Sequence, residues 1–201
     1  MQLQPEKVKD FFDRLASTWD STREPNYPVI ERILDAAGIT AGVTVLDAAC
    51  GTGVLFPSCL RRGVRHLTGV DLSPEMIRIA GEKFTDPRLT LLTGDAEALP
   101  LPRYDRIILF NAFPHFPHPQ RLIASLSGRL LPGGRLTIAH DRSRFAVNGH
   151  HEQEASEVSL GLSPAGTVAE WFAPHLTVDT AVDNDTCYIV SGAISARPDF
   201  A

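Results

Sequence analysis

The stretch Val45-Leu46-Asp47-Ala48-Ala49-Cys50-Gly51-Thr52-Gly53 decides the expected fold. It continues a β-branched apolar run, residues 43–46, that predicts a short buried strand. The strand ends at Asp47 and passes into a glycine-rich turn, and helix-like apolar spacing follows until Gly63. A strand, a glycine turn and a helix in this order give a ligand close access to the backbone and to free N–H groups at the helix start.

The alternation of strands and helices continues on both sides of this turn. Further strands are expected at 66–70, 89–92, 106–110 and 136–139, and helices at 6–19, 28–37, 74–84, 122–130 and 163–172, with Pro132-Gly133-Gly134 ending the fourth helix. Two last runs, 176–182 and 187–194, flank Asp183-Asn184-Asp185 and predict a hairpin. The expected fold is α/β: a single-domain Rossmann-like seven-stranded sheet, five parallel strands plus a terminal antiparallel hairpin, with helices on both faces.

Composition excludes several classes of protein. The 201 residues fit one domain, and 43% hydrophobic with 21% charged residues is typical of a folded globular chain. The net charge of −5 argues against a nucleic-acid binder, and three cysteines without a CxxC pair suit a reducing cytoplasm. Neither a signal peptide nor an apolar run of about 18 residues is present, so we expect a cytoplasmic protein without a membrane segment.

A strand-terminal acid points to an adenosine ligand. Asp71 ends the next strand, eighteen residues after Gly53, where a carboxylate can accept both hydroxyls of a ribose. The dinucleotide fingerprint requires Gly or Ala where this chain has Phe56, and the Gly-Lys-Ser/Thr of nucleotide phosphate loops is missing. These departures disfavour NAD and ATP.

Four segments together resemble class I S-adenosylmethionine (SAM)-dependent methyltransferases, in the small-molecule, type 11/25-like branch. They are the opening stretch 45–53, Val70-Asp71-Leu72-Ser73-Pro74-Glu75-Met76, Gly94-Asp95-Ala96-Glu97-Ala98-Leu99-Pro100 and Leu130-Leu131-Pro132-Gly133-Gly134-Arg135-Leu136. Their order and spacing agree with the family from about residue 10 to 195. The pair Ala48-Ala49 departs from the glycine-containing pairs that are commoner there, and alanine is strained at positive φ.

The resemblance implies SAM as cofactor, S-adenosylhomocysteine (SAH) as product, and a set of cofactor contacts. Asp47 would lie near the methionine amino group, Asp71 would hold the ribose hydroxyls, and Asp95 would accept from the adenine amino group. The full implied set is Asp47, Ala49, Gly51, Thr52, Gly53, Asp71, Leu72, Met76, Asp95, Ala96, Asn111 and Ala112.

The substrate side is less determined. Six of the seven histidines lie at or after His115. His115 and His140 are candidate catalytic bases, because imidazole titrates near pH ~6.5; the alternative for His115 is that it orders its loop. Candidate substrate contacts are Trp19, His115, Arg142, Arg144, His150 and His151, and the alternatives are core packing for Trp19 and solvated surface for the rest. We assign no metal site, although His140, His150 and His151 are candidate ligands.

The expected domain organisation limits the acceptor. N-terminal helices (6–38), a SAM-binding core (43–139) and the terminal hairpin (176–195) leave only residues 140–175 as a substrate cover. We therefore expect methyl transfer to a small molecule with an O, N or S nucleophile, or a pocket completed by a second subunit in a homodimer. The sequence Asn111-Ala112-Phe113-Pro114 lacks the motif used on flipped bases. The alternatives are a SAM-binding sensor or partner-binding protein without catalysis, and a methyltransferase organised by a His-bound metal.

Overall fold

The computed structural model describes residues 3–194, without the side chains of 151–154. Seven strands form one sheet in the order β3-β2-β1-β4-β5-β7-β6. They are β1 (Thr44–Ala48), β2 (His66–Asp71), β3 (Leu89–Thr93), β4 (Tyr104–Phe110), β5 (Leu130–His140), β6 (Thr177–Asp183) and β7 (Tyr188–Ala193). The first five strands pair in parallel, and β7 pairs antiparallel with both β5 and β6. The predicted seven-stranded fold is confirmed.

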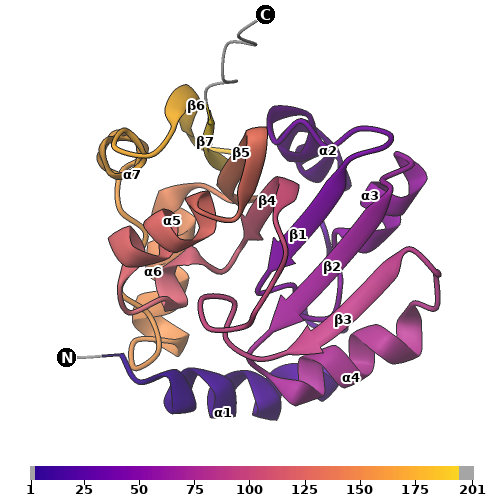
Figure 1. Ribbon diagram of the computed structural model, residues 1–201. Coiled ribbons are helices and arrows are strands. Elements are labelled where there is room, and N and C mark those ends of the chain that lie inside the picture. The colour runs from indigo at the N-terminus through magenta and orange to yellow at the C-terminus, as the bar shows by residue number, and fades with distance from the viewer. Residues whose placement is uncertain (1–2, 195–201) are drawn as a thin grey trace, which may run out of the picture.

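Helices cover both faces of the sheet (Figure 1). They are α1 (Pro5–Leu15), the 3₁₀ turn η1 (Ala16–Thr18), α2 (Tyr27–Ala36), α3 (Phe56–Arg61), α4 (Pro74–Lys83), the 3₁₀ turn η2 (Phe113–His115), α5 (Pro119–Ser127), α6 (Arg144–Glu154) and α7 (Ala165–Phe172). Ile33 of α2 and Cys59 of α3 are buried in one core cluster, whereas Leu126 of α5 and Phe172 of α7 are buried in the other. The strands are apolar toward both clusters, as a sheet covered on both faces requires.

One helix begins at the residue that its capping sequence predicts, and another begins later than predicted. Ser73 begins α4 as expected: its hydroxyl accepts from the Met76 N–H at 3.1 Å, and Pro74 occupies the first turn. The helix predicted over 163–172 begins only at Ala165; its N-cap residue Pro164 offers no side-chain acceptor, and the Ala165 N–H donates to Asp183 Oδ2 at 3.4 Å instead. The first predicted helix, 6–19, ends at Leu15 and continues as η1.

The segment Pro132-Gly133-Gly134 was wrongly expected to end a helix. α5 already ends at Ser127, and these three residues lie inside β5. Tyr104 pairs with Leu130 while Arg106 pairs with Arg135, so β5 carries extra residues that bulge between the two pairs. A bulge tolerates proline and a glycine at positive φ, which explains why the strand continues through a sequence typical of a turn.

The N-terminal segment lies across the end of the sheet to which the parallel strands point (Figure 1). Two aspartates hold it there. Asp13 of α1 accepts from the hydroxyl of Ser73 at the start of α4. Asp20 accepts from the Thr52 hydroxyl at 2.6 Å and from Lys83 Nζ at 2.6 Å. We call residues 5–25 the roof, because this segment closes the space above the strand ends.

Membrane-spanning helices are absent from residues 3–194, since none of the helices there is both long and apolar enough to cross a bilayer.

Tyr188 of β7 provides a test of the packing. Its side chain is fully buried, and its hydroxyl has no hydrogen-bond partner among the described residues. Because a buried polar group without a partner costs folding free energy, Tyr188→Phe should raise the free energy of unfolding by about 1 kcal/mol. Urea unfolding measures the change, and Tyr27→Phe is the near-neutral control because Tyr27 is 48% exposed. A destabilised Tyr188→Phe variant would contradict this packing.

Candidate active site

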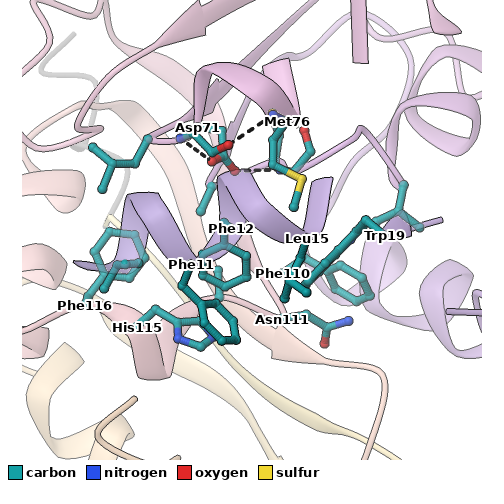
Figure 2. A pocket seen from close by; sticks show the side chains of 18 of the residues that line it. Phe11, Phe12, Leu15, Trp19, Asp71, Met76, Phe110, Asn111, His115 and Phe116 are labelled. Atoms are coloured by element: carbon teal, nitrogen blue, oxygen red, sulfur yellow. Dashed lines mark hydrogen bonds between the residues drawn. The ribbon is translucent and has the colours of Figure 1, made fainter. Parts of the chain in front are cut away.

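A cavity of about 410 Å³ lies between the roof and the carboxyl ends of β1 to β5. Figure 2 shows its aromatic side chains, with Phe11, Phe12 and Leu15 of α1 facing Asn111, His115 and Phe116. The volume falls toward the small end of the range for ligand pockets, roughly 300–1,000 Å³. A cavity at the carboxyl ends of parallel strands is the common ligand position in open α/β sheets.

The turn after β1 presents its backbone to this cavity. A Cβ added at Gly51 would meet only Trp19 Nε1, at 4.0 Å, so the glycine leaves room for a ligand. A Cβ at Gly53 would instead lie 2.4 Å from the ring of Phe56, so this glycine serves helix packing. Ala49 adopts a φ of +65°. Alanine is strained in this left-handed conformation, so the departure from glycine at Ala48-Ala49 has a steric cost.

Asp47 is a buried acid at the end of β1. It is 1% exposed, and neither carboxylate oxygen has a hydrogen-bond partner within the described structure. Burial, together with the charge of Asp71, raises the pKa of the Asp47 carboxyl to about 8. An acid in this state has unused capacity for a cationic or hydrogen-bonding group of a ligand.

Asp71 connects two turns. One oxygen accepts from the Gly51 N–H at 2.8 Å and the other from the Ser73 N–H at 2.9 Å. Burial raises the pKa of Asp71, while these two backbone bonds oppose the rise. Each carboxylate oxygen retains a lone pair, so Asp71 can still accept from a ligand at the cavity surface. Asp95 is exposed at the next strand end and accepts from the Glu97 N–H at 2.8 Å.

A reciprocal amide–carboxylate pair joins the ends of β4 and β5. Asn111 Nδ2 donates to Asp141 Oδ1 at 3.0 Å, and the Asp141 N–H donates to Asn111 Oδ1 at 3.2 Å. Asn111 has a φ of +55°, a conformation that asparagine tolerates better than most residues. The pair fixes the cavity floor next to the loop that carries His115.

His115 lies in the cavity wall against the roof. Its Nδ1 is 2.7 Å from the Val158 carbonyl oxygen, which can only accept, so Nδ1 carries the proton. The ring meets Phe12 edge to face, with centroids 4.9 Å apart. Burial is the main reason that the pKa of His115 falls to about 4, with a further reduction from nearby His150. His115 is therefore neutral at pH 7 and orders the segment that contains Val158.

Most of the predicted site residues line the cavity. They are Trp19, Ala49, Gly51, Asp71, Leu72, Met76, Asp95, Ala96, Asn111, Ala112, His115, His140, Arg142 and His150. Asp47, Thr52, Gly53 and Arg144 are not among the lining residues. Thr52 bonds to Asp20, and Arg144 Nε lies 2.7 Å from Asp183 Oδ2 in an ion pair outside the cavity. The side chain of His151 lies outside the described part of the chain.

The aromatic wall of Phe11 and Phe116 was not predicted. Phe11 belongs to the amphipathic helix at the N-terminus, and the adjacent pair Phe11-Phe12 is the sequence feature that could have indicated it.

Among the side chains that the structure describes, no cluster of three His, Cys, Asp or Glu could hold a metal ion.

Comparison with known proteins agrees with this geometry. Residues 45–134 match a family model described as a methyltransferase domain. The ubiquinone biosynthesis O-methyltransferase of Aeromonas salmonicida is 28% identical over 140 residues, 64% of this chain and 58% of that protein. The ubiquinone/menaquinone biosynthesis C-methyltransferase UbiE of Bordetella parapertussis is 28% identical over 210 residues, 96% and 74% of the two chains. The chain thus spans between about half and three quarters of these relatives.

The solved structures share the fold. Magnesium protoporphyrin IX methyltransferase of Synechocystis PCC 6803, with SAH bound, superposes with a TM-score of 0.73 at 17% identity, covering 96% of this chain and 100% of that one. A Haloferax volcanii methyltransferase in complex with the activator Trm112 gives 0.79 at 21% identity, with 94% and 98% covered.

The matched segment, the strand order and the cavity point to the same class. Residues 45–134 match the methyltransferase-domain family, and the sheet has the fold of class I, Rossmann-like, SAM-dependent methyltransferases. Within that class the matched model is the type 25 domain, in agreement with the predicted branch.

The raised pKa of Asp47 predicts how stability depends on pH when no ligand is bound. The unfolded carboxyl loses its proton near pH 4, whereas the folded one keeps it to about pH 8. Raising the pH through this window therefore destabilises the fold, by on the order of 3 kcal/mol between about pH 5 and pH 8. Asp47→Asn removes this titration, so its advantage in stability over the parent chain should grow with pH in urea unfolding. Parallel pH profiles for the two proteins would refute the assignment.

Proposed function

We propose that this chain transfers the methyl group of SAM to a small-molecule acceptor and releases SAH. The observation that carries the proposal is the pairing of an unsatisfied buried acid, Asp47, with an open glycine turn at Gly51, beside a cavity closed by an aromatic roof. The relatives' names describe methyl transfer to small molecules, which supports the same acceptor class. A chain of 201 residues whose cavity at the strand ends has a volume of about 410 Å³ suits a small acceptor.

The described residues fit SAM. Asp47 would bind the amino group of the methionine part, directly or through water, and Asp71 the ribose hydroxyls with its remaining lone pairs. Leu72 and Met76 would pack on the adenine, with Asp95 accepting from its amino group. SAM supplies an electrophilic methyl group on a positively charged sulfur.

The roof would align the reactants and exclude water. Phe11, Phe12 and Leu15 place apolar surface over the strand ends, and the two phenylalanine rings meet edge to face at 5.3 Å. A dry, ordered site contributes to a displacement reaction by holding donor and acceptor in line. The bonds of Asp13 to Ser73 and of Asp20 to Thr52 would keep the roof in register with the cofactor turns.

We infer that His115 positions the acceptor without removing its proton. At pH 7 its ring is neutral with a pKa of about 4, so it is a weak base, and its Nδ1 is engaged with Val158. The predicted role of His140 as a base stays a proposal; its ring lines the cavity and lies 6.0 Å from Tyr188, edge to face. The weak basicity of His115 favours acceptors such as amines, thiols or acidic hydroxyls, which need little help in losing a proton.

We also propose a cytoplasmic enzyme that does not act on nucleic acid, since the net charge is −5. A homodimer, a SAM-binding sensor without catalysis and a His-bound metal remain alternatives to be separated by experiment. SAM binding measured by calorimetry, followed by SAH release on a panel of small acceptors, decides between enzyme and sensor. Binding without turnover on any acceptor favours the sensor, and absence of SAM binding rejects the proposed function.

Asp71 should be necessary for cofactor affinity. Replacing it by asparagine removes a charged acceptor, which should weaken SAM binding by at least about tenfold in calorimetry. Asp86→Asn is the control, because Asp86 pairs with Arg88 and does not line the cavity. Equal affinities in the two variants would contradict the ribose assignment.

The role of His115 is tested by two substitutions. Asn can donate from Nδ2 to the Val158 carbonyl, so His115→Asn should keep kcat within about tenfold, whereas loss of a general base costs 10²–10⁴-fold. The kcat of the parent enzyme should show no His115 titration between about pH 5.5 and pH 8, because this pKa lies near 4. His115→Ala, which removes the loop bond as well, should lower stability. A hundredfold loss of kcat in His115→Asn would make His115 the base after all.

A further inference from the structure

The two halves of the cavity differ in chemistry. The ends of β2 and β3 contribute carboxylates, namely Asp71, Asp95 and Glu97. The ends of β4 and β5 and helix α6 contribute nitrogen-bearing side chains, namely Asn111, His115, His140, Arg142 and His150. The carboxylate in this second half is Asp141, and Asn111 already donates to it at 3.0 Å. The acidic half suits the positively charged cofactor, so the second half is left for the acceptor.

Arg142 is the cation available in the acceptor half. Of the four lysine and arginine side chains that line the cavity, Lys9 bonds to Asp13 at 2.7 Å and Arg121 to Glu97 at 3.1 Å. Arg23 lies over the ring of Trp19 at 3.5 Å. Arg142 is exposed and has no ion pair or hydrogen bond among the described residues. A guanidinium in this state can form a bidentate pair with a carboxylate.

The surface that faces the acceptor is aromatic. Phe11, Phe12 and Phe116 line the cavity, partly exposed to it, beside the edge of the His115 ring (Figure 2). Phe12 and His115 meet edge to face at 4.9 Å, so the two rings pack together within this wall. Such a wall packs well against a planar ring.

We propose that the acceptor is a small aromatic carboxylate, whose carboxylate binds Arg142 and whose ring packs against Phe12 and Phe116. This inference rests on the proposed methyltransferase function. A carboxylate fits better than a phosphate, because one guanidinium matches a single negative charge while a phosphate carries more. The group that receives the methyl is then a hydroxyl, amine or thiol on the ring side, in the aromatic part of the cavity.

The test uses the SAH-loaded protein and two matched probes, benzoate and benzamide, which share a planar ring and differ in charge. Calorimetry should show benzoate binding at least about tenfold more tightly than benzamide, as a charge-assisted bidentate contact implies. Arg142→Gln should remove this preference, and Arg142→Lys should restore part of it by keeping the charge. Arg144→Gln is the matched control: it removes the same charge two positions along the chain, outside the cavity, and should keep the preference.

Three outcomes would overturn the proposal. Equal affinities for benzoate and benzamide, or no benzoate binding to SAH-loaded protein, would exclude a carboxylate acceptor. A preference for benzoate that survives in Arg142→Gln would exclude Arg142 as its partner. Failure of the proposed function itself is distinguishable, because the parent protein would then not bind SAH. The affinity of Arg142→Gln for SAH is the folding control, and we expect it within about twofold of the parent.

Discussion

The carboxylate of Asp71 is the contact on which the site depends. It accepts hydrogen bonds from the backbone N–H groups of Gly51 and Ser73, and so connects the turn after β1 to the start of α4. Ser73 in turn donates to Asp13 of the roof, which extends the connection to α1. One partly buried acid therefore sets the relative positions of the glycine turn, the helix and the roof. Its oxygens also face the cavity, so the group that organises the empty site is the group that a ribose would bind.

The separation of charge within the cavity follows from strand order. β1, β2 and β3 form one half of the sheet and carry acids at or near their carboxyl ends. β4 and β5 form the other half and carry amide, imidazole and guanidinium groups there, together with one carboxylate, Asp141, to which Asn111 already donates. A cationic cofactor and an acceptor with a lone pair or a negative charge are attracted to different halves. The same order places the strand ends of β1 and β4 side by side at the centre, where donor and acceptor would meet.

The sequence was sufficient for the sheet, the cofactor turns and the start of α4, because periodicity, glycine turns and capping residues act over short distances. It was wrong where long-range pairing overrides local chemistry: Pro132-Gly133-Gly134 lies in a bulge of β5 that its pairing with β4 maintains. It also could not show that Gly53 packs on Phe56 or that Arg144 pairs with Asp183 outside the cavity. The Arg144–Asp183 pair joins residues 39 positions apart, which no local pattern relates, and the Gly53 contact depends on the orientation of the Phe56 ring at the start of α3.

The central claim is that the cavity holds SAM with its reactive end toward the aromatic wall. A crystal structure of the protein with SAH bound tests it most directly. We expect the ribose hydroxyls on the Asp71 carboxylate, the homocysteine amino group within one hydrogen bond or one water of Asp47, and the sulfur facing Phe12 and His115. SAH bound elsewhere, or a cavity that stays empty at saturating SAH, would contradict the account.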